Sequence, residues 1–201
     1  MSYFKYGNKE IEYLKEKDPK LGIEIDRIGM VQREVNPDIF SSLISSIISQ
    51  QISTSAAVTV KMRLIELIRE ITPENIHEAE VESIQRCGMS MRKAEYIKGV
   101  ASAAISNTID FENLHNLSDE EVIKELVSLK GVGEWTAEML LIHSLQRDNV
   151  LSYKDLAIRR GIMRLHNLEE ITKVEFEIYR ERYSPYCTVA SIYLWEISSR
   201  E

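Results

Sequence analysis

The sequence is poor in the residues that crosslink a chain, bind metal clusters or keep a chain extended. Only two cysteines occur among 201 residues, too few for a disulfide scaffold, a four-thiolate zinc site or a four-cysteine iron–sulfur cluster. Eight glycines and four prolines exclude collagen-like and linker-rich classes. The 44% hydrophobic and 28% charged residues indicate instead an ordered globular protein, with free thiols in a reducing compartment.

Long apolar runs are also missing. No stretch approaches the roughly 18 apolar residues of a membrane-spanning helix, so no membrane association is expected. The first residues carry charges every few positions instead of an apolar core, which argues against a secretory signal. The length allows one large domain or two small ones with a sizeable core.

The net charge is −7, from 25 basic and 32 acidic residues. An acidic balance argues weakly against nucleic acid as a partner. Basic residues nevertheless outnumber acidic ones within 86–98 and within 129–164. Ordinary solvated helix faces also produce such scatter, so charge alone leaves both interpretations open.

Hydrophobic periodicity is helical almost everywhere and predicts an all-α fold of about ten helices joined by short loops. Apolar residues recur at spacings of three and four in 39–48 and in 97–105. Helix starts are marked by Thr72 before a proline and by capping boxes at Ser118 and Thr172.

The most informative segment is a helix-hairpin-helix at 118–145. A helix from the Ser118 capping box is followed by the tight turn 129–133 and a second, apolar helix. Gly131 and Gly133 allow positive φ and close approach of another body to the main chain. The amides that begin the second helix are a site for an anion such as a DNA phosphate. An ordinary helix–helix turn also fits a lone GVG, so this signal is weak by itself.

A second segment, VLSYKDLAIRRG at 150–161, strengthens the pattern. Asp155 stands immediately before a helical run, which makes it a candidate N-cap whose carboxylate is held ionised by helix amides. A capping aspartate without any other role explains this position equally well in isolation. The combination of hairpin and polar helix start is more specific than either segment.

Together, LxGVGxWTA and the DLAIRRG helix start resemble the helix-hairpin-helix DNA glycosylases, in particular the 3-methyladenine DNA glycosylase II branch that removes alkylated purines. The SQQIS turn at 49–53, the CGMSMRKAEYI element at 87–97 and the closing helix at 186–195 are also similar to elements of this family. The likeness extends from Asp18 to Trp195. Lys130 replaces the usual proline of the hairpin.

The resemblance implies two helical subdomains with a cleft between them and the helix-hairpin-helix at the cleft. Residues 1–35 would pack with the C-terminal subdomain. Residues 36–145 would form a helical barrel that includes the hairpin at 118–145, and residues 146–201 would carry Asp155. No extra N-terminal β-domain is expected, and the protein is expected to be a monomer.

The resemblance also implies a monofunctional glycosylase of base excision repair, which flips out a damaged base and hydrolyses its N-glycosidic bond. Asp155 would stabilise positive charge on the sugar and orient or deprotonate water. Trp135, Trp195 and Met139 would line the base pocket, where an indole favours a cationic alkylated purine. Trp135 stands where bifunctional relatives place a lysine, so no strand cleavage is expected.

Double-stranded DNA with a damaged base is the expected partner, in the cytoplasm or nucleoid of a prokaryote or the nucleus of a eukaryote. The DNA-binding positions implied by the resemblance are Gln51, Ile52, Ser53, Gly131, Val132, Gly133 and Thr136. Either Gln51 or Ile52 would fill the gap left by the displaced base. No cofactor or iron–sulfur cluster is expected, although main-chain carbonyls of Val127, Leu129 and Val132 match a family site for Na⁺ or K⁺.

Two alternatives stay open from the sequence. The first is a glycosylase for an oxidised purine such as 8-oxoguanine, which is neutral and gains less from the tryptophan pair. The second is a non-catalytic DNA-binding module that keeps only the hairpin. The presence of Asp155 beside the hairpin speaks against this second alternative.

Overall fold

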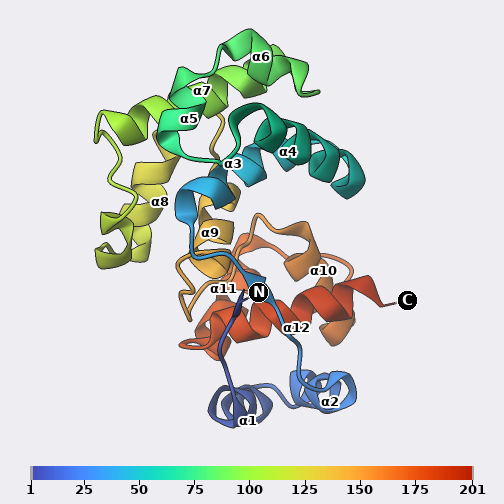
Figure 1. Cartoon of the computed structure of the whole chain (residues 1–201). Helices are drawn as coiled ribbons and strands as arrows, with labels where there is room; N and C mark the ends of the chain where they lie inside the picture. Colours follow the sequence, from blue (N-terminus) through green and yellow to red (C-terminus); the bar gives the residue numbers. More distant parts are fainter. Residues whose placement is uncertain (1, 201) are drawn as a thin grey trace. The chain divides into compact units, whose positions relative to one another are not determined.

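The computed structural model describes residues 2–200 and confirms the all-α class (Figure 1). Twelve α-helices lie within this described range, besides one 3-10 turn, η1 (Asn113–Asn116). The sequence did not predict the short antiparallel pair β1 (Ser2–Tyr3) and β2 (Glu34–Val35), in which Ser2 lies opposite Val35. Two-residue strands are too short to leave an alternating pattern.

The chain divides into two compact units, residues 36–140 and residues 1–35 with 141–201. The helices of the first unit are α3 (Ile39–Ser49), α4 (Thr54–Ile68), α5 (Pro73–Glu78), α6 (Val81–Arg86), α7 (Met91–Ile105) and α8 (Asp119–Val127). The helices of the second are α1 (Asn8–Lys17), α2 (Pro19–Ile28), α10 (Leu156–His166), α11 (Lys173–Tyr183) and α12 (Cys187–Ser199). Helix α9 (Glu134–His143) begins in the first and ends in the second.

The predicted helix starts are confirmed by their hydrogen bonds. The Ser118 hydroxyl accepts from the Glu121 amide, and the Glu121 carboxylate accepts in return from the Ser118 amide at 2.8 Å. Thr172 forms the same reciprocal pair with Glu175. These caps need only residues three positions apart, which is why the sequence reveals them.

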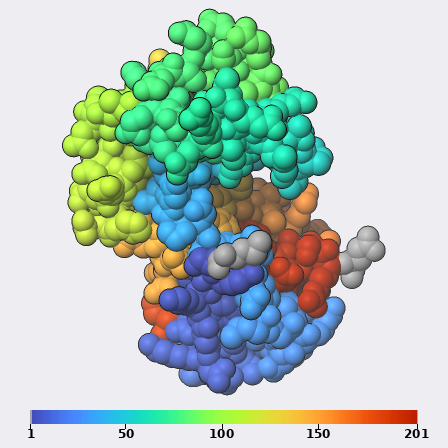
Figure 2. Space-filling model, in the orientation of Figure 1, coloured from blue at the N-terminus to red at the C-terminus, as the bar shows by residue number. Residues whose placement is uncertain are grey.

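In the unit of residues 36–140, helix α7 packs against α3, α5 and α6. Fully buried Leu43, Ile44 and Ile47 from α3 and Ile97 and Ala101 from α7 belong to its core. The surfaces of α4 to α7 form one packed body, coloured teal to green in Figure 2. The apolar stripe predicted for 39–48 therefore faces the core, and the stripe predicted for 97–105 does so as far as Ala101, whereas Ile105 at its end is 46% exposed.

In the other unit, α10 packs closely on α12, and α1 pairs with α2 (Figure 1). A Cβ added at Gly161 of α10 would lie 2.4 Å from the carbonyl oxygen of Leu194 in α12. Only glycine permits this approach of the two backbones. Buried Phe176, Tyr183 and Tyr193 complete the core around this contact.

The segment 86–98 is rich in basic residues, which would suit a phosphate. One of them, Lys98, instead binds main-chain carbonyls of the protein itself. The Lys98 ammonium donates to the carbonyls of His77 at 2.6 Å and Ala79 at 2.8 Å, at the C-terminal end of α5. A cation there satisfies unpaired carbonyls and complements the helix dipole.

Each helix within residues 2–200 is too short or too polar to span a lipid bilayer.

Candidate active site

The hairpin is the turn between α8 and α9. Gly131 has φ +87°, and a Cβ added there would lie 2.2 Å from Cδ2 of Tyr96, so the predicted need for glycine is confirmed at this position. The Val132 amide donates to the Leu129 carbonyl at 3.1 Å, which closes the turn. The hairpin backbone is thus shaped by one left-handed residue that rests on a tyrosine ring.

Gly133 differs from Gly131, because it does not use the positive φ that the sequence analysis allowed for both glycines. Its φ is not positive, and apart from Gly133 itself and its two neighbours in the chain, no atom of the described residues lies within 4 Å of an added Cβ. The residue is exposed and directly precedes α9. Any requirement for glycine at this position must therefore come from what approaches the hairpin from outside.

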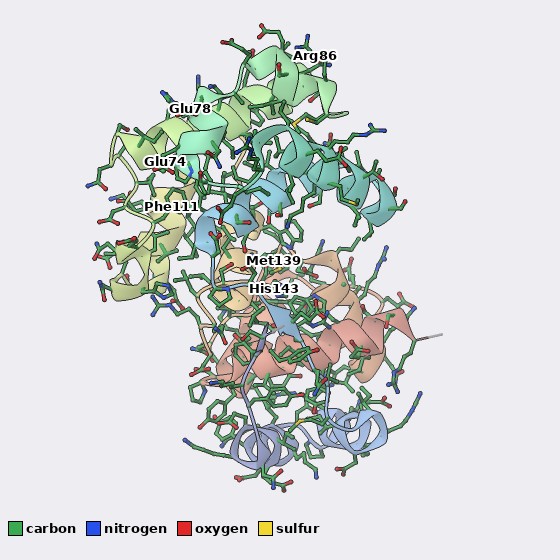
Figure 3. The ribbon with its side chains drawn as sticks, in the orientation of Figure 1. Glu74, Glu78, Arg86, Phe111, Met139 and His143 are labelled. Atoms are coloured by element: carbon green, nitrogen blue, oxygen red, sulfur yellow. The ribbon has the colours of Figure 1, made fainter. Side chains whose placement is uncertain are left out.

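The first turns of α9 carry three of the predicted site residues. Trp135 is 44% exposed, whereas Thr136 is 5% exposed and faces the protein interior. Met139 is half-buried, one helical turn after Trp135 and one before His143. Figure 3 labels Met139 and His143. Positions four apart share a helix face, so Trp135 and Met139 form one surface.

The turn between α3 and α4 also presents the predicted residues to solvent. Gln51, Ile52 and Ser53 are all exposed, with 40% exposure for Ile52. Ser53 caps α4 by accepting from the Ala56 amide at 3.3 Å. Gln51 adopts a left-handed conformation with φ 58°, which is uncommon for a residue other than glycine.

Asp155 is the N-cap of α10, as its position in the sequence predicts. Its Oδ1 accepts from the Ile158 amide at 2.9 Å, and the side chain is buried with 6% exposure. The Asp155 amide donates to the Ser152 carbonyl at 3.3 Å, which folds residues 152–155 into a turn. A carboxylate in this position is oriented by the helix start and shielded from water.

Two buried side chains of α12 fasten the segment that leads to Asp155. The Thr188 hydroxyl donates to the Arg147 carbonyl at 2.6 Å and accepts from the Val150 amide at 3.1 Å. The Ser191 hydroxyl donates to the Val150 carbonyl at 2.9 Å. These bonds fix main chain that lacks helix or strand partners, so the approach to Asp155 has a defined path.

His143, which no sequence motif singled out, lies beside Asp155 and Trp195. Its ring stacks on Trp195 with centroids 5.6 Å apart and 16° between planes. Burial lowers the pKa of His143, the Arg33 charge lowers it further, and a bond to the Glu34 main chain and the Asp155 charge oppose the shift. The only available signal was its spacing of four residues from Met139 on α9.

The Trp195 ring also carries a cation of the protein itself. The Arg33 guanidinium lies over the ring, 5.0 Å from its centroid, and pairs with Glu196 at 3.2 Å. Cation–π contact of this kind occupies ring surface that a ligand would otherwise use. Trp195 is accordingly half-buried, in contrast to the more exposed Trp135.

Protein side chains offer little for a transition metal. Within residues 2–200, no group of three or more His, Cys, Asp or Glu side chains is placed to hold an ion. Cys87 and Cys187 are both buried and free, and burial raises the pKa of the Cys187 thiol to about 12. Neither thiol is ionised at neutral pH, so both act as apolar core groups.

The chain is similar to known proteins over most of its length. Residues 44–185 match the family described as HhH-GPD superfamily base excision DNA repair protein. DNA-3-methyladenine glycosylase 1 of Schizosaccharomyces pombe is 40% identical over 164 residues, which cover 79% of this chain and 72% of that protein. The DNA-3-methyladenine glycosylase of Saccharomyces cerevisiae is 34% identical over 87% of this chain but only 64% of its own length.

Solved structures agree in fold. The DNA-3-methyladenine glycosidase of Bacillus halodurans has a TM-score of 0.88 at 35% identity and covers 99% of this chain and 93% of its own. The S. pombe 3-methyladenine DNA glycosylase in complex with abasic DNA has a TM-score of 0.83 at 34% identity, covering 94% and 96% respectively. The chain belongs to the HhH-GPD superfamily of base excision DNA repair proteins.

Proposed function

We propose that this protein is a monofunctional DNA glycosylase that extrudes alkylated purines from double-stranded DNA and hydrolyses their N-glycosidic bond to leave an abasic site. The observation that carries the proposal is the buried carboxylate of Asp155, held at the start of α10 after a segment fastened by α12. The relatives named above, 3-methyladenine glycosylases from yeasts and a bacterium, support the same substrate class.

Asp155 acts on the sugar. Cleavage of the glycosidic bond leaves positive charge on C1′ and O4′, and a carboxylate in a shielded site stabilises that charge more strongly than it would in water. The same group orients the attacking water and accepts its proton. An alkylated purine leaves as a neutral base, so its departure requires no general acid.

Trp135 is the better placed of the two tryptophans to stack on a cationic purine. Its ring is 44% exposed, whereas the half-buried Trp195 ring already carries Arg33. Stacking a cation on indole contributes about 0.5 to 2 kcal/mol. Trp195 stacks on His143, and the charge of Asp155 acts on that histidine.

The hairpin and the turn at 50–53 take the DNA itself. Gly133 is exposed without a side chain at the start of α9, where the helix dipole favours a phosphate. Thr136 contributes its main chain, since its side chain is buried. Gln51 or Ile52 fills the gap left by the extruded base, and Ser53 flanks it.

A monovalent cation at the hairpin is compatible with the donors present. The carbonyl oxygens of Val127, Leu129 and Val132 would hold it, and Na⁺ or K⁺ prefers such neutral oxygen ligands. The Leu129 carbonyl accepts one bond from Val132 and retains a second lone pair. The ion would supply positive charge next to a DNA phosphate.

A base-release assay tests the proposal. Duplexes with 3-methyladenine, 7-methylguanine, hypoxanthine or 8-oxoguanine are incubated with excess enzyme, and free base is quantified. We expect release of the methylated purines, and a fall on the order of 100-fold or more for Asp155→Asn with damaged-DNA binding retained. Release of 8-oxoguanine in preference to methylated purines, or wild-type rates for Asp155→Asn, would overturn the assignment.

The absence of strand cleavage is tested separately. The product strand should stay intact until alkali or heat is applied, because Trp135 offers no amine. Borohydride present during turnover should trap no covalent adduct. A trapped adduct would identify an amine nucleophile, and the exposed Lys154 beside Asp155 would be the first residue to replace.

A further inference from the structure

The hairpin and the turn at 50–53 are joined by a side chain to which the family motifs gave no role. Nε2 of Gln50 donates to the Gly131 carbonyl at 3.0 Å, across 81 residues of sequence. Gln50 is the C-cap of α3, and Gly131 is the left-handed residue of the hairpin. The bond thus connects the first residue of the turn at 50–53 to the centre of the hairpin.

Lys93 of α7 holds the same end of α3. Its ammonium donates to the Ile48 carbonyl at 2.8 Å and to the Gln50 carbonyl. Burial lowers the pKa of Lys93, whereas the terminal carbonyls of a helix are favourable partners for its ammonium charge. Lys93 fixes the main chain of Gln50, so the Gln50 side chain has a defined origin from which to reach Gly131.

Tyr96, three residues after Lys93, supports the hairpin side of this link. Its ring lies so close to Gly131 that an added Cβ would overlap it at 2.2 Å. The Arg92 guanidinium covers the ring at 5.4 Å from the centroid. Residues 93 and 96 lie on one face of α7, so a single helix supports both the turn and the hairpin.

The turn itself has a backbone that requires such support. Gln51 has φ 58°, a left-handed conformation that side-chain-bearing residues avoid and that persists where the surroundings impose it. Ile52 follows it with 40% exposure. The two side chains available to enter the base stack are those of Gln51 and Ile52. The turn that carries them is held on its protein side by the hydrogen bonds of Gln50 and Lys93.

We propose that Gln50 and Lys93 are positioning residues that keep the wedge, Gln51 and Ile52, at a fixed place relative to the hairpin. When the hairpin takes the phosphate backbone, the wedge is already aligned with the base stack and loses little conformational freedom on entering it. This inference rests on the proposed function for its effect on excision. It depends on contacts within residues 36–140 alone.

Gln50→Met removes the donor while retaining a side chain of similar length. We expect undamaged duplex to bind within about twofold of wild type, because the hairpin amides remain, and single-turnover base release to fall roughly tenfold. Lys93→Met should behave in the same way. Lys98→Met is the matched control, since this lysine of the same helix caps α5 instead of α3, and its release rate should not change.

Two further measurements separate positioning from general loss of structure. In a Gln51→Ala/Ile52→Ala background, adding Gln50→Met should cost nothing more, because no wedge remains to be aligned. Hydrogen exchange of the free protein should accelerate at 50–53 and 129–133 in Gln50→Met and not in Lys98→Met. A full additional loss in the double-alanine background, or unchanged exchange, would overturn the inference.

The exchange measurement uses no DNA, so it stands even if the substrate assignment fails. If wild type releases no methylated purine, the proposed function is wrong. The positioning is then judged by exchange and by binding to a duplex with a tetrahydrofuran abasic analogue, which Gln50→Met should bind several-fold more weakly. Equal binding of that duplex by wild type and Gln50→Met would count against the positioning role.

Discussion

The hairpin region and the Asp155 region both hold main chain in place between helices, but the first is exposed and the second is buried. Both consist of main chain between helices, and both are held by side chains from distant segments, Gln50 in one case and Thr188 and Ser191 in the other. In the hairpin region Gly133 is exposed to solvent, whereas the Asp155 side chain is 6% exposed. A surface proposed to bind DNA must be accessible to it, while a carboxylate proposed to stabilise charge on the sugar benefits from exclusion of water.

A second comparison lies inside the Asp155 unit, between two buried aspartates that both cap helices. Asp18 caps α2 and also accepts from the Tyr183 hydroxyl at 2.8 Å and from Arg182 at 3.2 Å, with His166 at 3.0 Å. Burial raises the pKa of Asp18, but these partners outweigh it and bring the pKa below its ordinary value. The contacts of Asp18 therefore stabilise the fold, which distinguishes this residue from the catalytic role proposed for Asp155.

The largest expected stability effect lies in the Asp155 unit. Gly161→Ala places a methyl 2.4 Å from the Leu194 carbonyl and forces α10 away from α12. Overpacking of this kind costs about 3 kcal/mol, of which better helix propensity recovers about 1 kcal/mol. Chemical denaturation should show the net loss. A variant as stable as wild type would mean that this unit tolerates changes as readily as the exposed hairpin.

Gly131→Ala tests whether the packed side of the hairpin is sensitive to an added side chain, although its outer side is exposed. The positive φ and the Tyr96 ring together should lower the free energy of unfolding by about 2 kcal/mol. Gly133→Ala is the matched control and should change stability by less than about 0.5 kcal/mol. Equal losses in the two variants would remove the distinction drawn between these glycines.

Asp18→Asn separates the structural aspartate from Asp155 by pH. The folded pKa lies well below the unfolded value of 3.8, so the carboxylate stabilises the fold fully above that value and loses this effect progressively as pH falls toward the folded pKa. At neutral pH the variant should be less stable by about 2 kcal/mol, and the gap should narrow progressively as pH falls below about 4. Urea denaturation at several pH values measures the gap, and a gap independent of pH would contradict the assignment.

The smallest expected effects distinguish the exposed residues from one another on DNA. Gly133→Val should weaken damaged and undamaged duplexes together, because its side chain crowds the phosphate. Trp135→Ala should weaken only damaged DNA, by about 1 kcal/mol, because only an extruded cationic base uses the ring. Affinities at one fixed salt concentration compare them. Wild-type binding of undamaged DNA by the Gly133 variant would place the DNA-binding surface elsewhere.

The sequence determined those features that depend on residues close together in the chain. The caps at Ser118, Thr172 and Asp155 are set by an oxygen and an amide three residues apart, and the left-handed Gly131 is set by the absence of a side chain. Such local rules hold whatever surrounds them. The all-α class followed from periodicity for the same reason.

Tertiary structure alone decided which distant groups meet. Gln50 reaches Gly131 over 81 positions and Thr188 reaches Arg147 over 41, while His143 stacks on Trp195. It also decided that Gly133 needs no glycine for its own backbone and that Lys93 points inward. Periodicity reports which face of a helix is apolar but not what that face contacts, so these pairings follow only from how the helices pack.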